Sequence, residues 1–249
     1  MSLLRAASRL SPALLALLLA FAPNARAGDL PPGFVRLAQV APTIRQAMRY
    51  AGSDNFAGRP LKGYEAPACI LRQEAALALA RVQAGLEAEH KTLVVYDCYR
   101  PVQAVADILA WAKAGGPQHG PQYPTAPRSK LVTLGYIAAH SQHSTGTAVD
   151  LGLAALDQPP IEGKPGAACT APIEERGEAG GLDFGTAFDC FDPKSATLAA
   201  GIPAAAAANR ALLVKAMQAQ GFSNYAREWW HFGYALKGAK AADFPVTGK

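Results

Sequence analysis

The sequence lacks several features that would place it in common classes of protein. Its 249 residues contain no block of Lys or Arg and no basic stretch interleaved with aromatic residues, so we expect no nucleic-acid partner. No internal repeat is visible, and the longest apolar run is too short to cross a membrane. No two cysteines have the C-x-x-C spacing, which argues against a zinc site made of four thiolates.

The first 27 residues have the pattern of a secretory signal peptide. A basic start leads into an apolar run over residues 12–22, and Ala25-Arg26-Ala27 matches an A-x-A cleavage site. We therefore predict an exported protein, periplasmic or secreted; a retained N-terminal anchor helix is the alternative. Because no cysteine lies at the cleavage point, we expect no lipid anchor there and no stable membrane anchor after cleavage.

Residues 28–249 are long enough to form one hydrophobic core, so we predict a single domain after the signal peptide 1–27. Helices are predicted at 71–86, 102–114 and 204–220. Strands are predicted at 43–50, 92–99, 147–153 and 228–236. The irregular alternation of these elements favours an α+β fold with an antiparallel sheet flanked by helices.

Four cysteines are present, and export would place them in an oxidising compartment where disulfides persist. We favour the pairs Cys69 with Cys98 and Cys169 with Cys190; one bridge with two buried free thiols is the alternative. The second pair would staple the long Pro- and Gly-rich segment 154–185, with a stabilisation of roughly 3 kcal/mol in the chain-entropy treatment. Segments of this length in a compact domain are usually functional or stapled.

Two short segments carry the strongest chemical signal, SQHSTGTAVD at 141–150 and EWWHF at 228–232. Gly146 lets the backbone turn between His143 and Asp150, so that both side chains can face one point. With His231 they would make three metal ligands, leaving the open position that distinguishes catalytic zinc sites. Glu228 could take the proton of a water bound there. The alternative is a surface histidine on a turn and a paired strand acid.

The spacing of Glu228 and His231 imposes a structural demand. Residues three apart on an ideal strand point to opposite faces. Both can reach one metal only if the chain bends or bulges near Trp229, or if Glu228 precedes the regular strand. His140 is the rival ligand, because on a helix it would share a face with His143.

With these residues in view, the chain resembles the D-alanyl-D-alanine dipeptidases. They belong to the zinc DD-peptidase superfamily, whose fold is shared with the hedgehog signalling domain. The resemblance runs from about residue 50 to residue 244. Its landmarks are DNFAGRPLKGY (54–64), YDCYRP (96–101), SQHSTGTAVDL (141–151), GTAFD (185–189) and EWWHF (228–232). The DNF, YRP and GTxFD segments point to the dipeptidase branch rather than to the carboxypeptidases.

The resemblance implies a hedgehog/DD-peptidase-like fold and hydrolysis of the free dipeptide D-Ala-D-Ala. It also implies one Zn²⁺ per chain bound by His143, Asp150 and His231. Glu228 would act as general base and then as acid. Arg100, which lies between a predicted strand and a helix, would stabilise the tetrahedral oxyanion; from the residues alone, a structural salt bridge is the alternative.

The resemblance further implies that Asp189 pairs with the substrate ammonium, and that Ser141 and Tyr64 line the dipeptide pocket. A small pocket with an acid at one end would select a free dipeptide, because a longer peptide would leave that buried charge unpaired. The alternatives are a murein DD-carboxypeptidase or endopeptidase with an open groove, and a non-catalytic zinc-stabilised binding module. A proton carrier such as Glu228 argues against the last.

Overall fold

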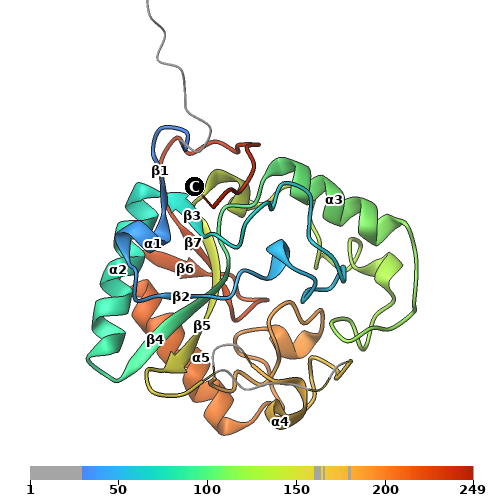
Figure 1. Cartoon of the computed structure of the whole chain (residues 1–249). Coiled ribbons are helices and arrows are strands. Elements are labelled where there is room, and N and C mark those ends of the chain that lie inside the picture. The colour runs from blue at the N-terminus through green and yellow to red at the C-terminus, as the bar shows by residue number, and fades with distance from the viewer. Residues whose placement is uncertain (1–29, 160–163, 165, 179–180, 249) are drawn as a thin grey trace, which may run out of the picture.

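The computed structural model describes residues 30–159, 164, 166–178 and 181–248 (Figure 1). The predicted signal peptide lies outside the described residues. No helix in the described part of the chain is long and apolar enough to span a membrane.

The main sheet has five strands in the order β2-β4-β5-β7-β6. Its strands are β2 (Arg45–Gln46), β4 (Lys91–Asp97), β5 (Ala148–Ala155), β6 (Phe222–Asn224) and β7 (His231–Tyr234). Neighbouring strands are antiparallel except β2 and β4, which run parallel. A separate antiparallel pair joins β1 (Phe34–Arg36) to β3 (Ile70–Arg72). The predicted α+β class is confirmed, with one correction: the edge strand β2 is parallel to its neighbour.

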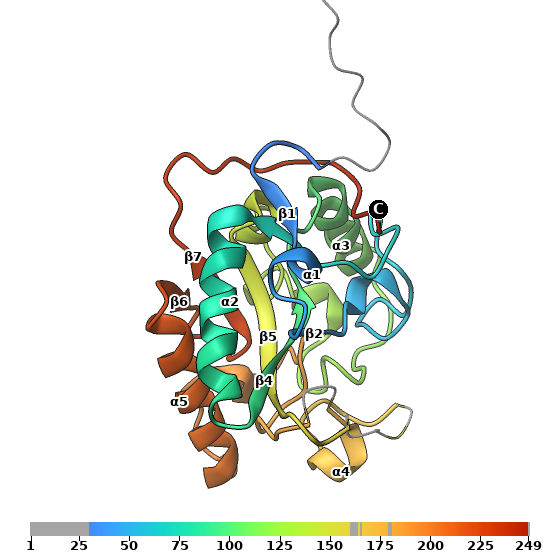
Figure 2. The same ribbon diagram turned by 60° about the vertical axis from the view of Figure 1, so that its left-hand side comes forward.

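Helices cover the sheet unequally. They are α1 (Leu37–Val40), α2 (Gln73–Glu87), α3 (Val102–Lys113), α4 (Ile173–Arg176) and α5 (Ala204–Gln218). The long helices α2 and α5 pack side by side along one face of the sheet, and α3 lies beyond the other side (Figure 1, Figure 2). Residues 92–97 of β4 are all buried, because the strand is covered on both faces.

The three long helices begin and end close to where the sequence predicts. Pro101 directly precedes α3, where its missing backbone N–H costs no hydrogen bond, because the first N–H groups of a helix have no intrahelical acceptor. Gly115, in a left-handed conformation with φ 70°, follows the end of that helix. Leu71 belongs to β3 rather than to α2, so the predicted start at 71 is two residues early.

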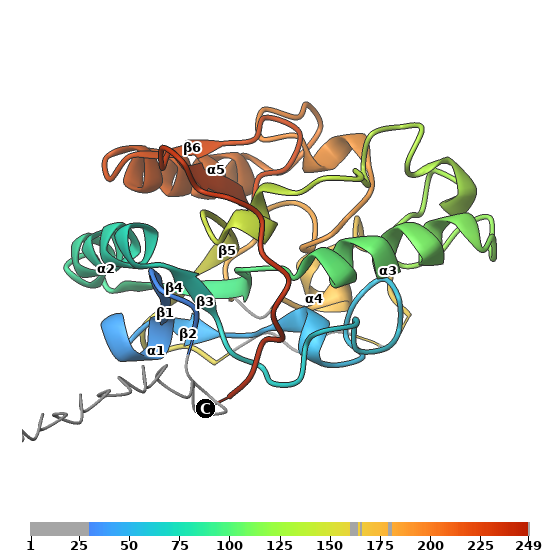
Figure 3. The same ribbon diagram turned by 90° about the horizontal axis from the view of Figure 1, so that it is seen from above.

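The predicted strands are less regular than the helices. Only Arg45–Gln46 of the predicted strand 43–50 pairs with the sheet, and a 3₁₀ turn follows at Arg49–Ala51. The predicted strand 228–236 begins at His231, so Glu228 precedes it. β5 is the central strand of the sheet, and Asp150 on it pairs with Asp97 at the end of β4 and with His231 at the start of β7. Seen from above, α2 and α5 lie on the opposite side of the molecule from α3 (Figure 3).

Both favoured disulfides are present, Cys69–Cys98 and Cys169–Cys190. The first joins the residue before β3 to the residue after β4. The second crosses a long connection between β5 and α5 in which α4 is the only α-helix among the described residues. The alternative with two free thiols does not hold, because all four cysteines are bonded.

Candidate active site

The sheet itself brings three predicted ligands together. Asp150 on β5 pairs directly with His231 on β7, so that their side chains lie on one face as neighbours. His143 lies in a 3₁₀ turn (Gln142–Thr145) just before β5. Gly146 connects the turn to the strand with φ 73°, and a Cβ there would lie 2.4 Å from the ring of Phe34. Only glycine therefore lets the chain turn this tightly and deliver His143 to the sheet.

The three donor atoms fit a small divalent cation. His143 Nε2 lies 3.2 Å from Asp150 Oδ1 and 3.1 Å from His231 Nδ1, and His231 Nδ1 lies 3.0 Å from Asp150 Oδ1. Ligands about 2.0–2.1 Å from a tetrahedral zinc would stand roughly 3.3 Å apart, close to these separations. These residues could hold a metal, and two nitrogens with one carboxylate oxygen are a donor set that suits zinc.

The second nitrogen of His143 supports this arrangement. His143 Nδ1 lies 2.7 Å from the carbonyl oxygen of Cys98. In the tautomer with the hydrogen on Nδ1, this nitrogen donates to that oxygen, and Nε2 keeps the lone pair that a metal needs. The ring is 1% exposed, so its orientation is held by packing as well. Metal-binding histidines are commonly oriented by such a backbone acceptor.

Asp150 divides its two oxygens between different partners. Oδ1 faces both histidines, and Oδ2 lies 3.5 Å from Arg100 Nη2. Burial opposes the ionisation of Asp150, but the charges and hydrogen bonds of His143 and His231 outweigh it, so the pKa of Asp150 lies below its usual value. Asp150 is therefore a carboxylate at neutral pH, as a metal ligand must be.

The chain turns between Glu228 and His231, which meets the demand imposed by their spacing. The amide of His231 donates to the carbonyl of Glu228 at 3.3 Å, and β7 begins only after this turn. Glu228 Oε2 consequently lies 4.0 Å from His231 Nδ1, on the same side of the chain. Trp229 anchors the turn, because its indole stacks on Phe184 and its Nε1 donates to Thr186 Oγ1 at 2.8 Å.

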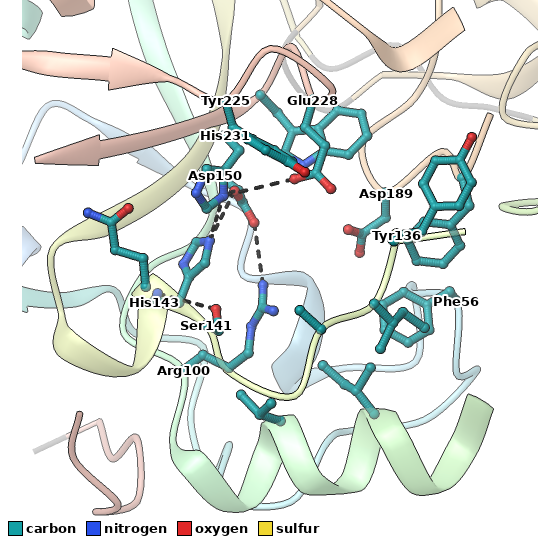
Figure 4. Close-up of a pocket in the computed structure, with 18 of the residues that line it drawn as sticks. Phe56, Arg100, Tyr136, Ser141, His143, Asp150, Asp189, Tyr225, Glu228 and His231 are labelled. Carbon is teal, nitrogen blue, oxygen red and sulfur yellow. Dashed lines mark hydrogen bonds and ion pairs between the residues drawn. The ribbon is translucent and has the colours of Figure 1, made fainter. Parts of the chain in front are cut away.

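Glu228 has the properties of a base that works near neutral pH. Its side chain is 18% exposed and faces the pocket (Figure 4). Burial raises the pKa of Glu228 to about 7, while the neighbouring His231 acts in the opposite direction. A carboxylate with a pKa near the working pH can both accept and return a proton.

Arg100 is held beside the ligand group by Asp97, a residue that our reading of the sequence did not single out. Arg100 Nε and Nη2 each lie 2.9 Å from Asp97 Oδ2, and the same oxygen lies 3.4 Å from His143 Nδ1. Arg100 thus forms a structural salt bridge, which was the alternative prediction for it, and it also lines the pocket. Asp97 lies inside the landmark YDCYRP at the end of a buried strand, which is the signal that could have identified it.

The structure places Tyr64 away from the pocket wall where it was expected. Tyr64 is 6% exposed, and its hydroxyl donates to Asp97 Oδ1 at 2.5 Å. It is not among the residues that line the pocket, and it reaches the site through Asp97 and through its ring contact with Tyr50, at 5.7 Å between ring centroids. Ser141 does line the pocket, and its Oγ accepts from the backbone N–H of His143 at 3.3 Å.

Asp189 lies at the opposite end of the pocket. It is 7% exposed, and the hydroxyl of Tyr50 donates to its Oδ2 at 2.8 Å. Burial, reinforced by the charge of Asp150, raises the pKa of Asp189 well above its usual value. The guanidinium of Arg100 stands over the Tyr50 ring, 5.0 Å from its centroid. Tyr50 therefore lies between Arg100 and Asp189, a position that no local sequence pattern indicated.

The three ligand residues, Glu228, Arg100, Ser141, Tyr50 and Asp189 all line one pocket of about 220 Å³. Figure 4 shows the group His143, Asp150 and His231 on one side of it and Asp189 on the other. Its apolar walls come from Phe56, Val105, Ile108, Phe191 and Trp230. The rival ligand His140 is exposed at the rim and takes no part in the ligand group.

Comparisons with known proteins assign the chain to a family. A family profile described as D-ala-D-ala dipeptidase matches residues 31–161 and 165–245. The chain belongs to this peptidase family. It is 36% identical to a D-alanyl-D-alanine dipeptidase of Enterococcus faecalis, with 80% of this chain and 90% of the relative covered. It is 35% identical to one from Streptomyces coelicolor (82% and 93% covered) and 32% identical to one from Escherichia coli (85% and 88% covered).

Membership confirms the resemblance and the fold expected from it. The protein is a metallopeptidase, and the cluster of two histidines and one aspartate is where its metal could bind. The matched residues include every residue of the pocket named above and stop before the last residues of the chain.

Proposed function

We propose that this metallopeptidase hydrolyses the free dipeptide D-Ala-D-Ala to D-alanine, with one Zn²⁺ held by His143, Asp150 and His231. The observation that carries the proposal is the pocket with a ligand group at one end and the buried Asp189 at the other. Its volume of about 220 Å³ is smaller than the ~300–1,000 Å³ of sites for drug-sized ligands, which favours a very small substrate. The names of the relatives agree with this substrate.

The residues of the chain divide the hydrolysis between them. A bound zinc ion would supply Lewis acidity and lower the pKa of water. Glu228 takes the proton of the attacking water and delivers it to the nitrogen of the leaving amino acid. Arg100, fixed by Asp97, presents its guanidinium to the negative charge that develops on the scissile carbonyl oxygen.

Asp189 recognises the free amino terminus of the substrate. A buried carboxylate is costly to ionise alone, as the raised pKa of Asp189 indicates, and an incoming ammonium compensates that cost. An N-acylated peptide brings no positive charge and adds volume at the same place. The pocket therefore favours the free dipeptide over a peptide that continues toward its amino terminus.

A comparison of three substrates tests the proposal. Zinc-loaded protein is offered D-Ala-D-Ala, an N-acylated D-Ala-D-Ala and a muramyl pentapeptide, and D-alanine release is measured. We expect rapid turnover of the free dipeptide and little or none of the other two. Comparable rates on the blocked or long substrates would instead support a murein DD-carboxypeptidase or endopeptidase, and no turnover of any of them would support a binding module.

We also propose that the chain is exported, that it is cleaved after Ala27, and that residues 28–249 act as one domain. The two disulfides support this location, because such bonds persist in oxidising compartments. Expression of the full chain in a bacterium, followed by fractionation and N-terminal sequencing, tests it. A protein that stays in the cytoplasm with its first residues intact would overturn this part of the proposal.

A further inference from the structure

The residue that carries the amine-binding carboxylate has an unusual backbone conformation. Asp189 has φ 57°, in the left-handed region. Few residues other than glycine adopt it, although Asp and Asn tolerate it better than most. Such conformations persist where the surrounding structure holds them, and they cluster at functional sites. The position of this carboxylate therefore depends on what restrains residues 187–191.

Covalent and hydrogen-bonded restraints meet at this segment. Cys190 directly follows Asp189 in the chain and forms a disulfide with Cys169, and both cysteines are buried. The amide of Ala187 donates to the carbonyl of Cys169 at 2.8 Å, and the amide of Phe191 donates to the carbonyl of Gln122 at 2.7 Å. The hydroxyl of Tyr50 also holds the Asp189 carboxylate, and the disulfide is the one covalent cross-link of residues 187–191.

The rest of this connection offers little regular structure. Between the two cysteines, α4 (Ile173–Arg176) is the only α-helix among the described residues, and no strand of the sheet is described there. The ligands His143, Asp150 and His231 lie instead on the sheet and on the turn before it. A cross-link in a weakly structured segment restrains its own surroundings more than it restrains a distant sheet.

We propose that the Cys169–Cys190 disulfide is a positioning element for Asp189, so that the bond maintains the affinity of the pocket for the substrate ammonium. This rests on the proposed function, in which Asp189 binds that ammonium. Without the bond, Asp189 relaxes from its left-handed conformation and its carboxylate leaves the pocket end. The expected effect falls on KM for substrates with a free amine, while metal affinity stays close to that of the unaltered protein.

A double-mutant cycle tests the coupling. Asp189→Asn, Cys169→Ser/Cys190→Ser and the combined triple variant are compared in the metal-loaded protein, with D-Ala-D-Ala and with an analogue that lacks the amino group. Loss of the charged contact should raise KM for the dipeptide about 10–100-fold in Asp189→Asn. The disulfide variant should show an increase on the order of tenfold, and none beyond that of Asp189→Asn in the triple variant.

Two further readouts separate positioning from general destabilisation. The analogue without an amino group should react equally well with and without the disulfide. Leu213→Ala, a cavity variant in the buried face of α5, should lower the melting temperature without changing KM. If the serine variant fails to fold, Cys169→Ala/Cys190→Ala, alone and combined with Asp189→Asn, gives the same comparison, because alanine suits these buried positions better than serine and Cys69–Cys98 stays intact.

The outcomes separate a failure of this inference from a failure of the proposed function on which it rests. An unchanged KM in Asp189→Asn overturns the amine site itself, and the positioning role with it. A raised KM in Asp189→Asn together with an unchanged KM in the disulfide variant overturns the positioning role alone. Additive effects in the triple variant also overturn it, because they would mean that the bond acts through some other group.

Discussion

The two ends of the pocket are built in different ways. The metal-ligand end stands on paired strands: Asp150 and His231 are direct partners across β5 and β7, and His143 enters from the turn that leads into β5. The other end, called the amine end because Asp189 is proposed to bind the substrate amine there, lies on an irregular connection. Asp189 has a left-handed backbone, and the disulfide cysteine Cys190 follows it directly. Regular backbone hydrogen bonding holds the first end, and a covalent staple with scattered contacts holds the second.

In the proposed reaction, the two ends of the pocket have different roles: one carries out the hydrolysis and the other selects the substrate. Asp150 and His231 are placed by paired strands, and His143 and Glu228 lie in the short turns that lead into those strands, so changes in the long connections leave their geometry intact. The group that would choose the substrate sits where the chain can vary without disturbing the sheet. We therefore expect changes at the first end to abolish turnover, and changes at the second to alter which substrate is bound and how tightly.

Metal removal should have the largest effect. A chelator should abolish turnover of D-Ala-D-Ala, and one equivalent of Zn²⁺ per chain should restore it, because three donor atoms converge on one point. The melting temperature should fall with the metal and recover with it, since the folded ligand group binds the ion and the unfolded chain does so poorly. Full activity in protein shown to be metal-free would mean that the three ligand residues do not act by binding a metal, so the two ends of the pocket would not differ in the way described.

Replacing the proposed base should come next. Glu228→Gln should lower kcat about 10²–10⁴-fold, because the amide cannot accept the proton of the attacking water. Metal content should not change, since Glu228 Oε2 lies 4.0 Å from the nearest ligand nitrogen. Metal analysis beside steady-state kinetics checks both parts. Near-normal turnover with metal bound would show that another group moves the proton.

Arg100 should have a smaller effect of the same kind. Arg100→Met should lower kcat on the order of 10²–10³-fold, as for the loss of one donor to an oxyanion. Arg100→Lys should recover only part of this loss, because a single ammonium cannot reproduce the paired contact of Nε and Nη2 with Asp97. A variant that changes KM alone would place Arg100 with the substrate-binding groups.

The smallest effect should be a gain of stability at the amine end. Burial raises the pKa of Asp189, so the folded protein retains this proton at pH values where the unfolded chain, with a pKa near 3.9, has lost it. Asp189 therefore lowers stability increasingly as the pH rises above about 4. Asp189→Asn should raise the melting temperature of the substrate-free protein at pH 7 and have little effect near pH 4. Equal effects at both pH values would contradict the raised pKa.

The sequence predicted the metal-ligand end more completely than the amine end. His143, Asp150, His231 and Glu228 lie in two short segments whose spacing carries their chemistry, and the structure brings all four to one pocket. The long helices were also predictable, because their apolar residues repeat with a helical period. The two-residue strand β2 was not, because its pairing with β4 depends on a partner far along the chain.

The amine end was predictable only through family resemblance. Tyr50 and Asp189 form their hydrogen bond across 139 positions of sequence, so no local pattern could indicate it. Tyr64 was expected in the pocket wall and lies behind it instead, because its buried ring packs against Tyr50 and its hydroxyl bonds to Asp97. Residues that act through such distant contacts leave little trace in their own neighbourhood.

The sequence by itself determined which side chains could bind a metal, where the strong helices form, and which family the landmarks belong to. These properties depend on residue type and short spacing, which are local. Only the tertiary structure decided that Glu228 precedes β7 and shares a side with His231, that Asp97 holds Arg100, and that a left-handed Asp189 closes the far end of the pocket. These depend on turns and long-range contacts whose geometry is set by packing of the whole chain.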